Sequence, residues 1–349
     1  GDDMQDEIIS YNDDEYIIIP NPIYDVVFKY LMEDNESAKI IISTLINENI
    51  KSIQLEPVSH SAKITGKDSS DTGVSAVDDI RLFHLDFTAT VELPDGTEEL
   101  IMIELQKASE PNDIFRFKRY ISRNFQKKNE VEIADPVTGS IINIDRPVRL
   151  IPIFILNFRI ENEINDLLIR TNKVKTGVFK EKELTKFNEF IDHLTYDILV
   201  VQLPNLNNIT EDEYKDDIYK SKLYSLMKIF DQKSKVKSNK HRLRLIRKFF
   251  PGFLERVIKR LQSADIANPD IEEEMHLEDE YLRVLEEKNN LISFMNEQLI
   301  KQKEAIEEQQ KALELSNKEK EEQQLIIQKM SKLLEEKGID INEINNIKF

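Results

Sequence analysis

The feature that most constrains the fold is a predicted β-hairpin at Arg81–Lys107. Two stretches of alternating or continuous apolar residues flank a segment rich in turn-forming residues, Leu93-Pro94-Asp95-Gly96-Thr97. Proline presets the backbone for the first corner of a type I turn, and Gly96 can take the left-handed conformation that follows. A three-residue loop of this kind places Leu93 opposite Thr97, which fixes how every later residue of the two strands is paired.

This register brings two acidic side chains together. Asp86 lies opposite Glu104, with Cβ atoms roughly 5 Å apart, and Gln106 shares their face because strand side chains alternate. Adjacent carboxylates repel unless a cation lies between them, and oxygen ligands suit Mg²⁺ or Mn²⁺. We therefore predict a divalent metal site at Asp86 and Glu104. The alternative is a two-residue loop, which would turn Glu104 to the opposite face and leave an ordinary acidic hairpin.

Composition limits the remaining possibilities. At 349 residues the chain can form one substantial domain with an appendage, or two domains. Charged residues make up 33%, which is high for a globular domain and predicts a long polar helix. The absence of cysteine excludes disulfides, zinc–thiolate sites and cysteine nucleophiles. No apolar stretch approaches the roughly 18 residues of a membrane span, and the opening residues lack the core of a signal peptide. We therefore expect a cytoplasmic protein with no membrane contact.

Charge is unevenly distributed along the chain. The net charge is −18, yet Lys233–Arg260 contains eleven Lys and Arg against the single acid Glu255. Such a basic segment either binds phosphates, as in nucleic-acid-binding proteins, or docks on acidic parts of the same chain. The first nineteen residues form an acidic lead-in that is expected to be solvated.

Hydrophobic periodicity predicts the order of elements. Before the hairpin we expect a helix at Asp25–Asn49, a short strand at Ile50–Val58 and a loop at Ser59–Asp79. After it we expect a second helix at Glu110–Lys128, a loop at Val131–Pro147 and a buried central strand at Val148–Phe158. The order is therefore α-β-β-β-α-β. Beyond the central strand we expect a helix at Leu184–Leu194, a strand at Tyr196–Leu203 and a helix at Glu211–Phe230. In the basic segment we expect two short helices separated by Pro251-Gly252.

The C-terminal part of the sequence predicts one long helix. Apolar residues recur at sevenfold spacing from Leu285 to Leu334, interrupted at Lys320, while the second seam position is mostly polar. A helix over Glu273–Lys337 would be about 100 Å long. Such a sequence either pairs as a weak coiled coil, giving a homo-oligomer, or extends alone as a solvated helix.

Several of these segments together resemble the PD-(D/E)XK nuclease superfamily, specifically the recombination-promoting nuclease / putative transposase family. The resemblance covers roughly residues 20–230. It is carried by Asp25-Val26-Val27-Phe28-Lys29, Leu85-Asp86-Phe87, Ile103-Glu104-Leu105-Gln106, Phe115-Arg116 with Arg119-Tyr120, Ile151–Phe158 and Leu199–Leu206. It implies an α/β fold with a restriction-endonuclease-like αβββαβ core around a mixed central sheet, and metal-dependent cleavage of phosphodiester bonds.

The resemblance also implies roles for individual residues. The superfamily's metal ligands correspond to Asp86 and Glu104, and its lysine corresponds to Gln106, which cannot supply a positive charge. Lys107 is adjacent but lies on the opposite strand face. Asp25 occupies the family's helix position, either as a peripheral acid near the metal or as a helix cap. His84 shares the face of Asp86, where we expect a surface histidine.

The helix after the hairpin carries a basic stripe that suggests a substrate contact. Arg116, Tyr120, Arg123 and Lys127 follow helical spacing, and Arg119 lies beside them in the family motif. Beside a metal site such a stripe can neutralise the phosphates that flank a cleaved bond. The alternative is a basic face that is merely solvated.

These observations predict a Mg²⁺- or Mn²⁺-dependent DNA endonuclease linked to recombination or mobile elements. The alternative is a catalytically weak or inactive nuclease-fold protein that binds DNA or acts as a scaffold and oligomerises through its C-terminal helix. The predicted organisation begins with an acidic lead-in (1–19) and a nuclease-like domain (20–230). A basic helical segment (231–268), a long helix (269–338) and a tail (339–349) follow.

Overall fold

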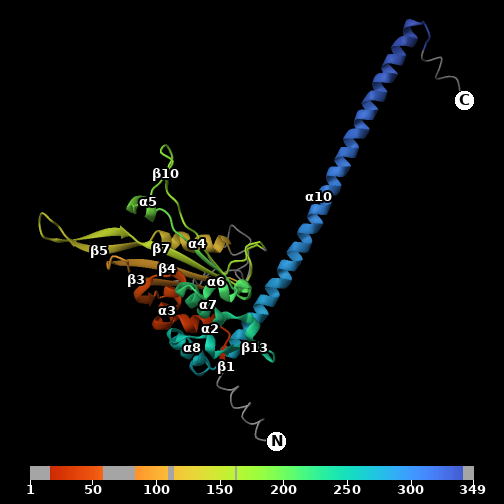
Figure 1. The fold of residues 1–349 in the computed structure, drawn as a ribbon. Helices are drawn as coiled ribbons and strands as arrows, with labels where there is room; N and C mark the ends of the chain where they lie inside the picture. The colour runs from red at the N-terminus through yellow and green to blue at the C-terminus, as the bar shows by residue number, and fades with distance from the viewer. Residues whose placement is uncertain (1–15, 58–82, 109–113, 162, 341–349) are drawn as a thin grey trace, which may run out of the picture. The chain divides into compact units, whose positions relative to one another are not determined.

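The structure is a computed structural model that describes residues 16–57, 83–108, 114–161 and 163–340. The chain divides into two compact units, Gly1–Glu278 and Asp279–Phe349. The first unit is a mixed α/β body built on a central sheet, and the described part of the second is helical (Figure 1).

Six strands form the central sheet in the order β2-β3-β4-β7-β11-β8. Their bounds are Asn49–Leu55 (β2), Phe83–Glu92 (β3), Glu98–Ala108 (β4), Arg149–Leu156 (β7), Leu199–Gln202 (β11) and Leu168–Arg170 (β8). Strands β4, β7 and β11 run parallel, whereas β2, β3 and β8 pair antiparallel with their neighbours, so the sheet is mixed. The predicted central strand is confirmed, because β7 lies between β4 and β11 and is apolar on both faces.

The hairpin forms with the predicted register. Asp86 pairs with Glu104. The amide of Leu93 donates to the carbonyl of Thr97 at 2.8 Å, and Gly96 has a φ of 82°. Glycine is favoured at this position because a side chain would be strained there. The three-residue loop therefore fixes which face of each strand carries the acids.

The two faces of the sheet differ in what covers them. The main core lies on the face of the odd-numbered residues of β3 and β4, such as Phe87 and Ile103, both fully buried. Helices α2 (Asp25–Met32), α3 (Asn35–Ile46), α7 (Ile218–Met227) and α8 (Glu255–Gln262) contribute to that core. The opposite face is covered by α4 (Ile114–Phe125), which packs on a smaller cluster that includes Met102 and Phe154 (Figure 1). Even-numbered residues of the hairpin therefore face α4.

The predicted helix Asp25–Asn49 is wrong as a single element, because the chain breaks between α2 and α3. Asp34 is the N-cap of α3, and its carboxylate accepts from the amide of Ser37 at 3.1 Å and from the Ser37 hydroxyl at 2.6 Å. Such a cap satisfies donors that a helix start leaves unpaired, so it stabilises a new helix at this point. Asp34 also forms a two-bond ion pair with Arg256 of α8.

We expect Asp34→Ala to lower the free energy of unfolding by about 1–2 kcal/mol, since it removes a helix cap and a partly exposed ion pair. The hydrogen bond from Arg256 holds the pKa of Asp34 below its usual range. A lowered carboxyl pKa stabilises the fold above the unfolded pKa, and this contribution is lost as the pH falls through the acid range. Urea unfolding at neutral pH and near pH 3 measures both effects, with the exposed neighbour Glu36→Ala as control. An equal loss of stability at both pH values would contradict the role of the ionised carboxylate.

Three further predictions need correction. The predicted loop Val131–Pro147 is an antiparallel pair, β5 (Lys128–Ala134) and β6 (Ile141–Pro147), around a turn in which Gly139 has a φ of 70°. The helix predicted at 184–194 is confined to α5 (Glu189–His193). The helix predicted at 211–230 is divided into α6 (Glu211–Tyr214), α7 and a 3₁₀ turn (Lys228–Phe230), because Asp217 caps a new start. The predicted loop at 59–79 lies outside the described residues.

The basic segment also differs from its prediction. Instead of a first helix it contains strand β13 (Asn239–Ile246), which pairs with β1 (Tyr16–Pro20) and with the short β12 (Lys235–Val236). His241, Leu243 and Leu245 are buried along one face of β13, the alternation expected of a strand. Its α-helices are α8 and the short α9 (Ala264–Ala267), and Pro251 lies between two 3₁₀ turns, Arg247–Phe249 and Gly252–Leu254, so the predicted first helix is wrong.

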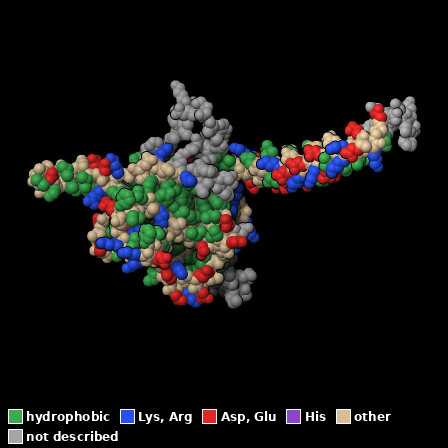
Figure 2. Space-filling model, turned by 90° about the horizontal axis from the view of Figure 1, so that it is seen from above, with side chains coloured by type: hydrophobic (Ala, Val, Ile, Leu, Met, Phe, Trp, Pro, Cys, Tyr) green, Lys and Arg blue, Asp and Glu red, His purple; other side chains and the backbone are tan. Residues whose placement is uncertain are grey.

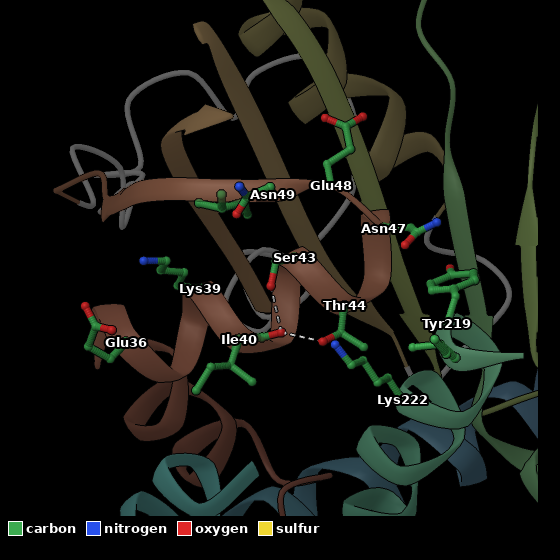
Figure 3. A pocket seen from close by; sticks show the side chains of 12 residues that line it. Glu36, Lys39, Ile40, Ser43, Thr44, Asn47, Glu48, Asn49, Tyr219 and Lys222 are labelled. Carbon is green, nitrogen blue, oxygen red and sulfur yellow. Dashed lines mark hydrogen bonds between the residues drawn. The ribbon is translucent and has the colours of Figure 1, made fainter. Parts of the chain in front are cut away.

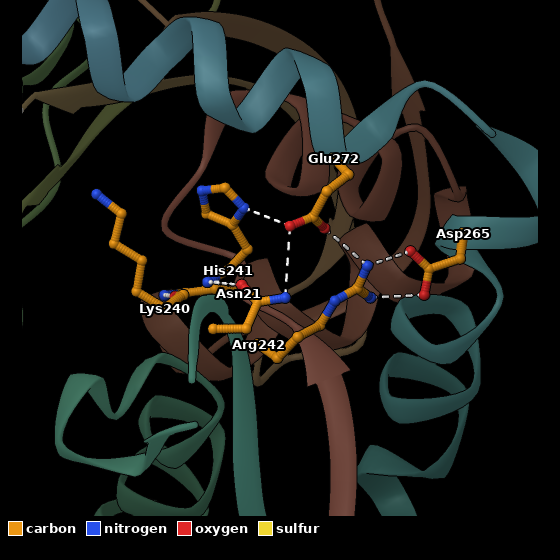
Figure 4. Close-up of polar contacts among 7 residues, drawn as sticks. Asn21, Lys240, His241, Arg242, Asp265 and Glu272 are labelled. Atoms are coloured by element: carbon orange, nitrogen blue, oxygen red, sulfur yellow. Dashed lines mark hydrogen bonds and ion pairs between the residues drawn. The ribbon is translucent and has the colours of Figure 1, made fainter. Parts of the chain in front are cut away.

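The arginines of this segment bind groups of the same chain. Arg242 contacts Asp265 at 2.6 Å and Glu272 at 3.0 Å, and Glu272 also lies 2.6 Å from the imidazole of His241 (Figure 4). Arg256 binds Asp34, as described above. The guanidinium of Arg260 lies 3.5 Å from the ring centroid of Tyr30 and donates to its carbonyl. Of the two alternatives for the basic segment, docking within the chain is therefore the one that these contacts support.

The predicted long helix is confirmed as α10 (Ile271–Glu336), 66 residues in length. Its apolar residues beyond the first turns are exposed, among them Leu291, Ile306 and Leu313. No helix in the described part of the chain combines the length and hydropathy needed to cross a membrane. Pairing of α10 in a homo-oligomer stays a prediction.

Candidate metal centre

Three potential metal ligands converge on the α4 side of the hairpin. His84 and Asp86 come from β3 and Glu104 from β4, and one ligand atom of each lies within 4.8 Å of the others. The side chains are held by strand alternation and by the register of the turn, so local sequence fixes the cluster. The predicted convergence of Asp86 and Glu104 is confirmed, and His84 is added to it.

Asn124 of α4 joins the two carboxylates. Its amide nitrogen donates to Asp86 Oδ1 at 2.7 Å and to Glu104 Oε2 at 3.0 Å, and the side chain is buried. Sequence reasoning missed this residue. Asn124 lies four positions after Tyr120, on the side of α4 that carries the predicted stripe. That spacing was the available signal.

His84 is not the surface histidine that we expected. Its Nε2 lies 2.9 Å from Asp86 Oδ1 and 3.7 Å from Glu104 Oε1. The orientation of the imidazole ring does not allow a hydrogen bond from this nitrogen to a described residue. The ring stacks on Tyr120, with centroids 4.2 Å apart and planes 23° from parallel. Tyr120 thus fixes the imidazole while its Nε2 stays available to a ligand.

Gln106 is fully buried beside the acids. Its amide nitrogen donates to Glu104 Oε1, whereas its Oε1 has no hydrogen-bond partner among the described residues. A buried oxygen without a partner costs free energy, as does an unused buried nitrogen such as His84 Nε2. A hydrated cation between the carboxylates would satisfy both atoms. The residues present therefore fit a divalent metal ion.

The two carboxylates have opposite pKa shifts. The pKa of Glu104 is raised to about 7, chiefly by burial and also by the charge of Asp86, against the lowering effects of the hydrogen bonds from Asn124 and Gln106 and of His84. Burial also raises the pKa of Asp86, but the nearby His84 and the hydrogen bond from Asn124 outweigh it and hold that pKa below its usual range. One acid is thus ionised and its neighbour is ready to release a proton to a cation.

Asp25 does not join this cluster. It is the first residue of α2, and its carboxylate lies 2.6 Å from Lys107 Nζ on the opposite face of the sheet. Lys107 is buried, also donates to the carbonyl of Ile23, and lies 3.9 Å from Glu278. The prediction that Lys107 lies on the face opposite Gln106 is confirmed. It neutralises Asp25 and is directed away from the metal ligands.

The predicted substrate residues are only partly described. The side chains of Arg116 and Arg119 lie outside the described residues. Tyr120 contacts the centre through His84, and the exposed Arg123 lies with its guanidinium 5.8 Å from the Tyr120 ring centroid. Arg123 therefore lies one turn along α4 from Tyr120, where its exposed guanidinium can meet a phosphate from solvent.

A separate hollow of 660 Å³ lies between α3, the turn that follows it and α7 (Figure 3). Several of its polar groups are engaged within the chain: the hydroxyls of Ser43 and Thr44 both donate to the carbonyl of Ile40, and Glu48 binds Arg149 in two hydrogen bonds.

Comparison of the chain with protein-family models, with curated proteins and with solved structures found no match. The geometry of the centre is therefore the structural basis for inferring a function.

Proposed function

We propose that this chain is a divalent-metal-dependent nuclease that hydrolyses phosphodiester bonds in DNA, with a restriction-endonuclease-like core. The observation that carries the proposal is the joining of Asp86 and Glu104 by Asn124 beside His84. The resemblance to the PD-(D/E)XK superfamily supports it, since Asp86 and Glu104 correspond to that superfamily's acids and strands β2, β3 and β4 are followed by α4 and β7, with the β5–β6 pair inserted before β7. A link to recombination or mobile elements is part of the proposal through that resemblance alone.

Each residue of the centre has a distinct role in this proposal. Asp86 and Glu104 would hold the divalent ion, which when bound would supply a water of lowered pKa and neutralise charge on the scissile phosphate. Asn124 holds both carboxylates in place through its amide. Gln106 presents its Oε1 as an acceptor that can orient the attacking water. Because Gln106 has no charge, it cannot stabilise a developing oxyanion as a lysine would, so we expect modest turnover.

The first test is nicking of supercoiled plasmid in the presence of Mg²⁺ or Mn²⁺, with an EDTA control. Conversion to open circles that requires the metal supports the proposal. Equal amounts of open circle with and without EDTA would refute it.

The imidazole ligand predicts which ion is preferred. Nitrogen ligands suit transition metals better than Mg²⁺, so we expect Mn²⁺ to bind about tenfold more tightly than Mg²⁺. His84→Ala should reduce that preference, because it leaves only oxygen ligands. Isothermal titration of both ions into the two proteins measures the ratio, and Asn143→Ala on the exposed face of β6 is a suitable control. An unchanged ratio in His84→Ala would show that the imidazole does not bind the ion.

A further inference from the structure

The segment between β8 and β11 exposes an unusual number of aromatic rings. Residues 171–194, named here the lobe, contain the two-residue strands β9 (Thr176–Gly177) and β10 (Lys182–Glu183) and helix α5. Within it Phe179 is fully exposed, Phe190 is 75% exposed and Phe187 is 65% exposed. Three exposed phenylalanines within twelve positions form an apolar surface of the kind that marks a binding site.

Residues 171–187 of the lobe are basic, whereas the remainder adds Glu189 and Asp192, so that the whole lobe has five lysines against four acids. Residues 171–187 contain five lysines and two glutamates, in a chain whose net charge is −18. Two of the lysines directly adjoin the rings, in Phe179-Lys180 and Lys186-Phe187. A local positive charge interleaved with aromatic rings is the arrangement by which proteins bind the phosphates and bases of an unpaired strand.

Contacts inside the lobe give it a defined shape. Lys175 Nζ lies 2.8 Å from Asp192 of α5 and 2.8 Å from the carbonyl of Lys186, which ties the β9–β10 hairpin to the helix. Phe179 and Lys180 lie between the two short strands, at the hairpin tip. The rings of Phe187 and His193 meet edge to face at 5.8 Å.

The base of the lobe packs on α4, the helix that contributes Asn124 to the metal centre. Tyr196, just after the lobe, packs edge to face on Phe125 of α4 with ring centroids 5.6 Å apart, and Lys173 lies 4.9 Å from the Tyr196 ring. Phe125 directly follows Asn124, which joins Asp86 and Glu104. Strand β10 and α5 lie on the same side of the sheet as α4 (Figure 1), and the view onto that side shows hydrophobic side chains gathered there (Figure 2).

We propose that the lobe binds a single-stranded segment of the nucleic acid substrate, with its phenylalanines stacked on unpaired bases and its lysines beside the phosphates. This inference rests on the proposed function for its placement beside the cleavage site. Exposed rings select unpaired bases because a duplex presents base edges in its grooves and keeps base faces stacked. The occupant is nucleic acid rather than a second copy of the chain, since the lysines that adjoin the exposed rings complement the phosphates of a strand.

The test is binding of a fluorescent oligothymidylate, measured by anisotropy in EDTA so that no cleavage occurs. We expect the wild type to bind it more tightly than a duplex of equal length. The triple variant F179A/F187A/F190A should bind at least about tenfold more weakly, since each stacked base contributes strongly to affinity. Phe294→Ala, an exposed phenylalanine of α10, is the matched control and should bind as the wild type does. A double variant, Lys180→Glu with Lys182→Glu, should bind more weakly and show less dependence on salt.

Wild-type affinity in the triple variant would overturn the proposal. Light scattering gives a second contrary outcome. If the wild type is an oligomer, the triple variant is a monomer and oligonucleotide affinity is unchanged, the lobe is a protein interface and the proposal is overturned. The proposed function fails separately: a protein whose lobe variants lose binding but which never nicks DNA with any divalent metal keeps the lobe inference and loses the nuclease. Conversely, a protein that nicks DNA with a divalent metal, but whose lobe variants bind the oligonucleotide as the wild type does, keeps the nuclease proposal and loses the lobe inference.

Discussion

We expect Asp86→Asn to reduce metal-dependent plasmid nicking at least about a hundredfold while the fold is retained. A metal ion contributes several kcal/mol to the transition state of phosphodiester hydrolysis, and each 1.36 kcal/mol is about tenfold in rate. Asparagine keeps the size of the side chain and can still accept the hydrogen bond from Asn124, so the change removes charge and little else. The measurement is the initial rate of nicking at saturating Mn²⁺.

The control for this variant is Glu98→Gln, an exposed carboxylate on the same strand as Glu104. It should nick DNA at the wild-type rate. Equal rates for Asp86→Asn and the wild type would show that any nicking arises elsewhere in the chain or from a contaminating nuclease.

The second large effect is on stability. A Glu104 pKa raised from 4.5 to about 7 means that the unfolded chain releases its proton at lower pH than the folded chain does. The unfolded state therefore binds fewer protons between these values, and stability falls by roughly 3 kcal/mol as the pH rises through them. Glu104→Gln removes this loss, at a cost of about 1 kcal/mol for one hydrogen bond that an amide cannot accept. In EDTA at pH 8 we expect the variant to be more stable by about 2 kcal/mol.

Urea unfolding in EDTA near pH 5 and pH 8 tests this expectation. The advantage of Glu104→Gln should be small or absent near pH 5, where the wild-type carboxyl is protonated, and should grow towards pH 8. Adding Mn²⁺ should stabilise the wild type and leave the variant unchanged, because a ligand stabilises only the state that binds it. A variant that is less stable than the wild type at pH 8 in EDTA would contradict the burial of an ionisable carboxylate. A centre that destabilises the apo fold is expected of a functional site.

The part of the fold predicted correctly from sequence is the part determined locally. The turn at 93–97 sets the hairpin register through proline and glycine, and strand β7 is evident as a continuous apolar stretch. The break at Asp34 and the pairing of β5 with β6 were missed. Both depend on side-chain or backbone hydrogen bonds that compete with a regular pattern of apolar residues.

Errors in the basic segment have a different cause. Leucine and arginine in β13 favour helix intrinsically, but β13 pairs with β1, which lies more than two hundred positions earlier in the chain. Tertiary pairing of this kind outweighs local propensity, and the alternation of Leu243 and Leu245 with arginines was the local sign of a strand.

The centre was predicted in part for the same reasons. Asp86, Glu104 and Gln106 share a face through strand alternation and the register set by the turn, both of which a sequence reveals. The roles of His84 and Asn124 depend on how α4 packs across the hairpin, and the pairing of Asp25 with Lys107 depends on how α2 packs on the other face. Packing between elements distant in sequence was not available to the sequence argument.

Electron paramagnetic resonance of Mn²⁺ mixed with the full chain tests the metal centre most directly, because free Mn²⁺ gives a signal that diminishes on binding. We predict that the wild type and Glu98→Gln bind Mn²⁺, and that Asp86→Asn and Glu104→Gln each lose a bound ion. Equal binding by all four proteins, or by none, would contradict a cation site between Asp86 and Glu104.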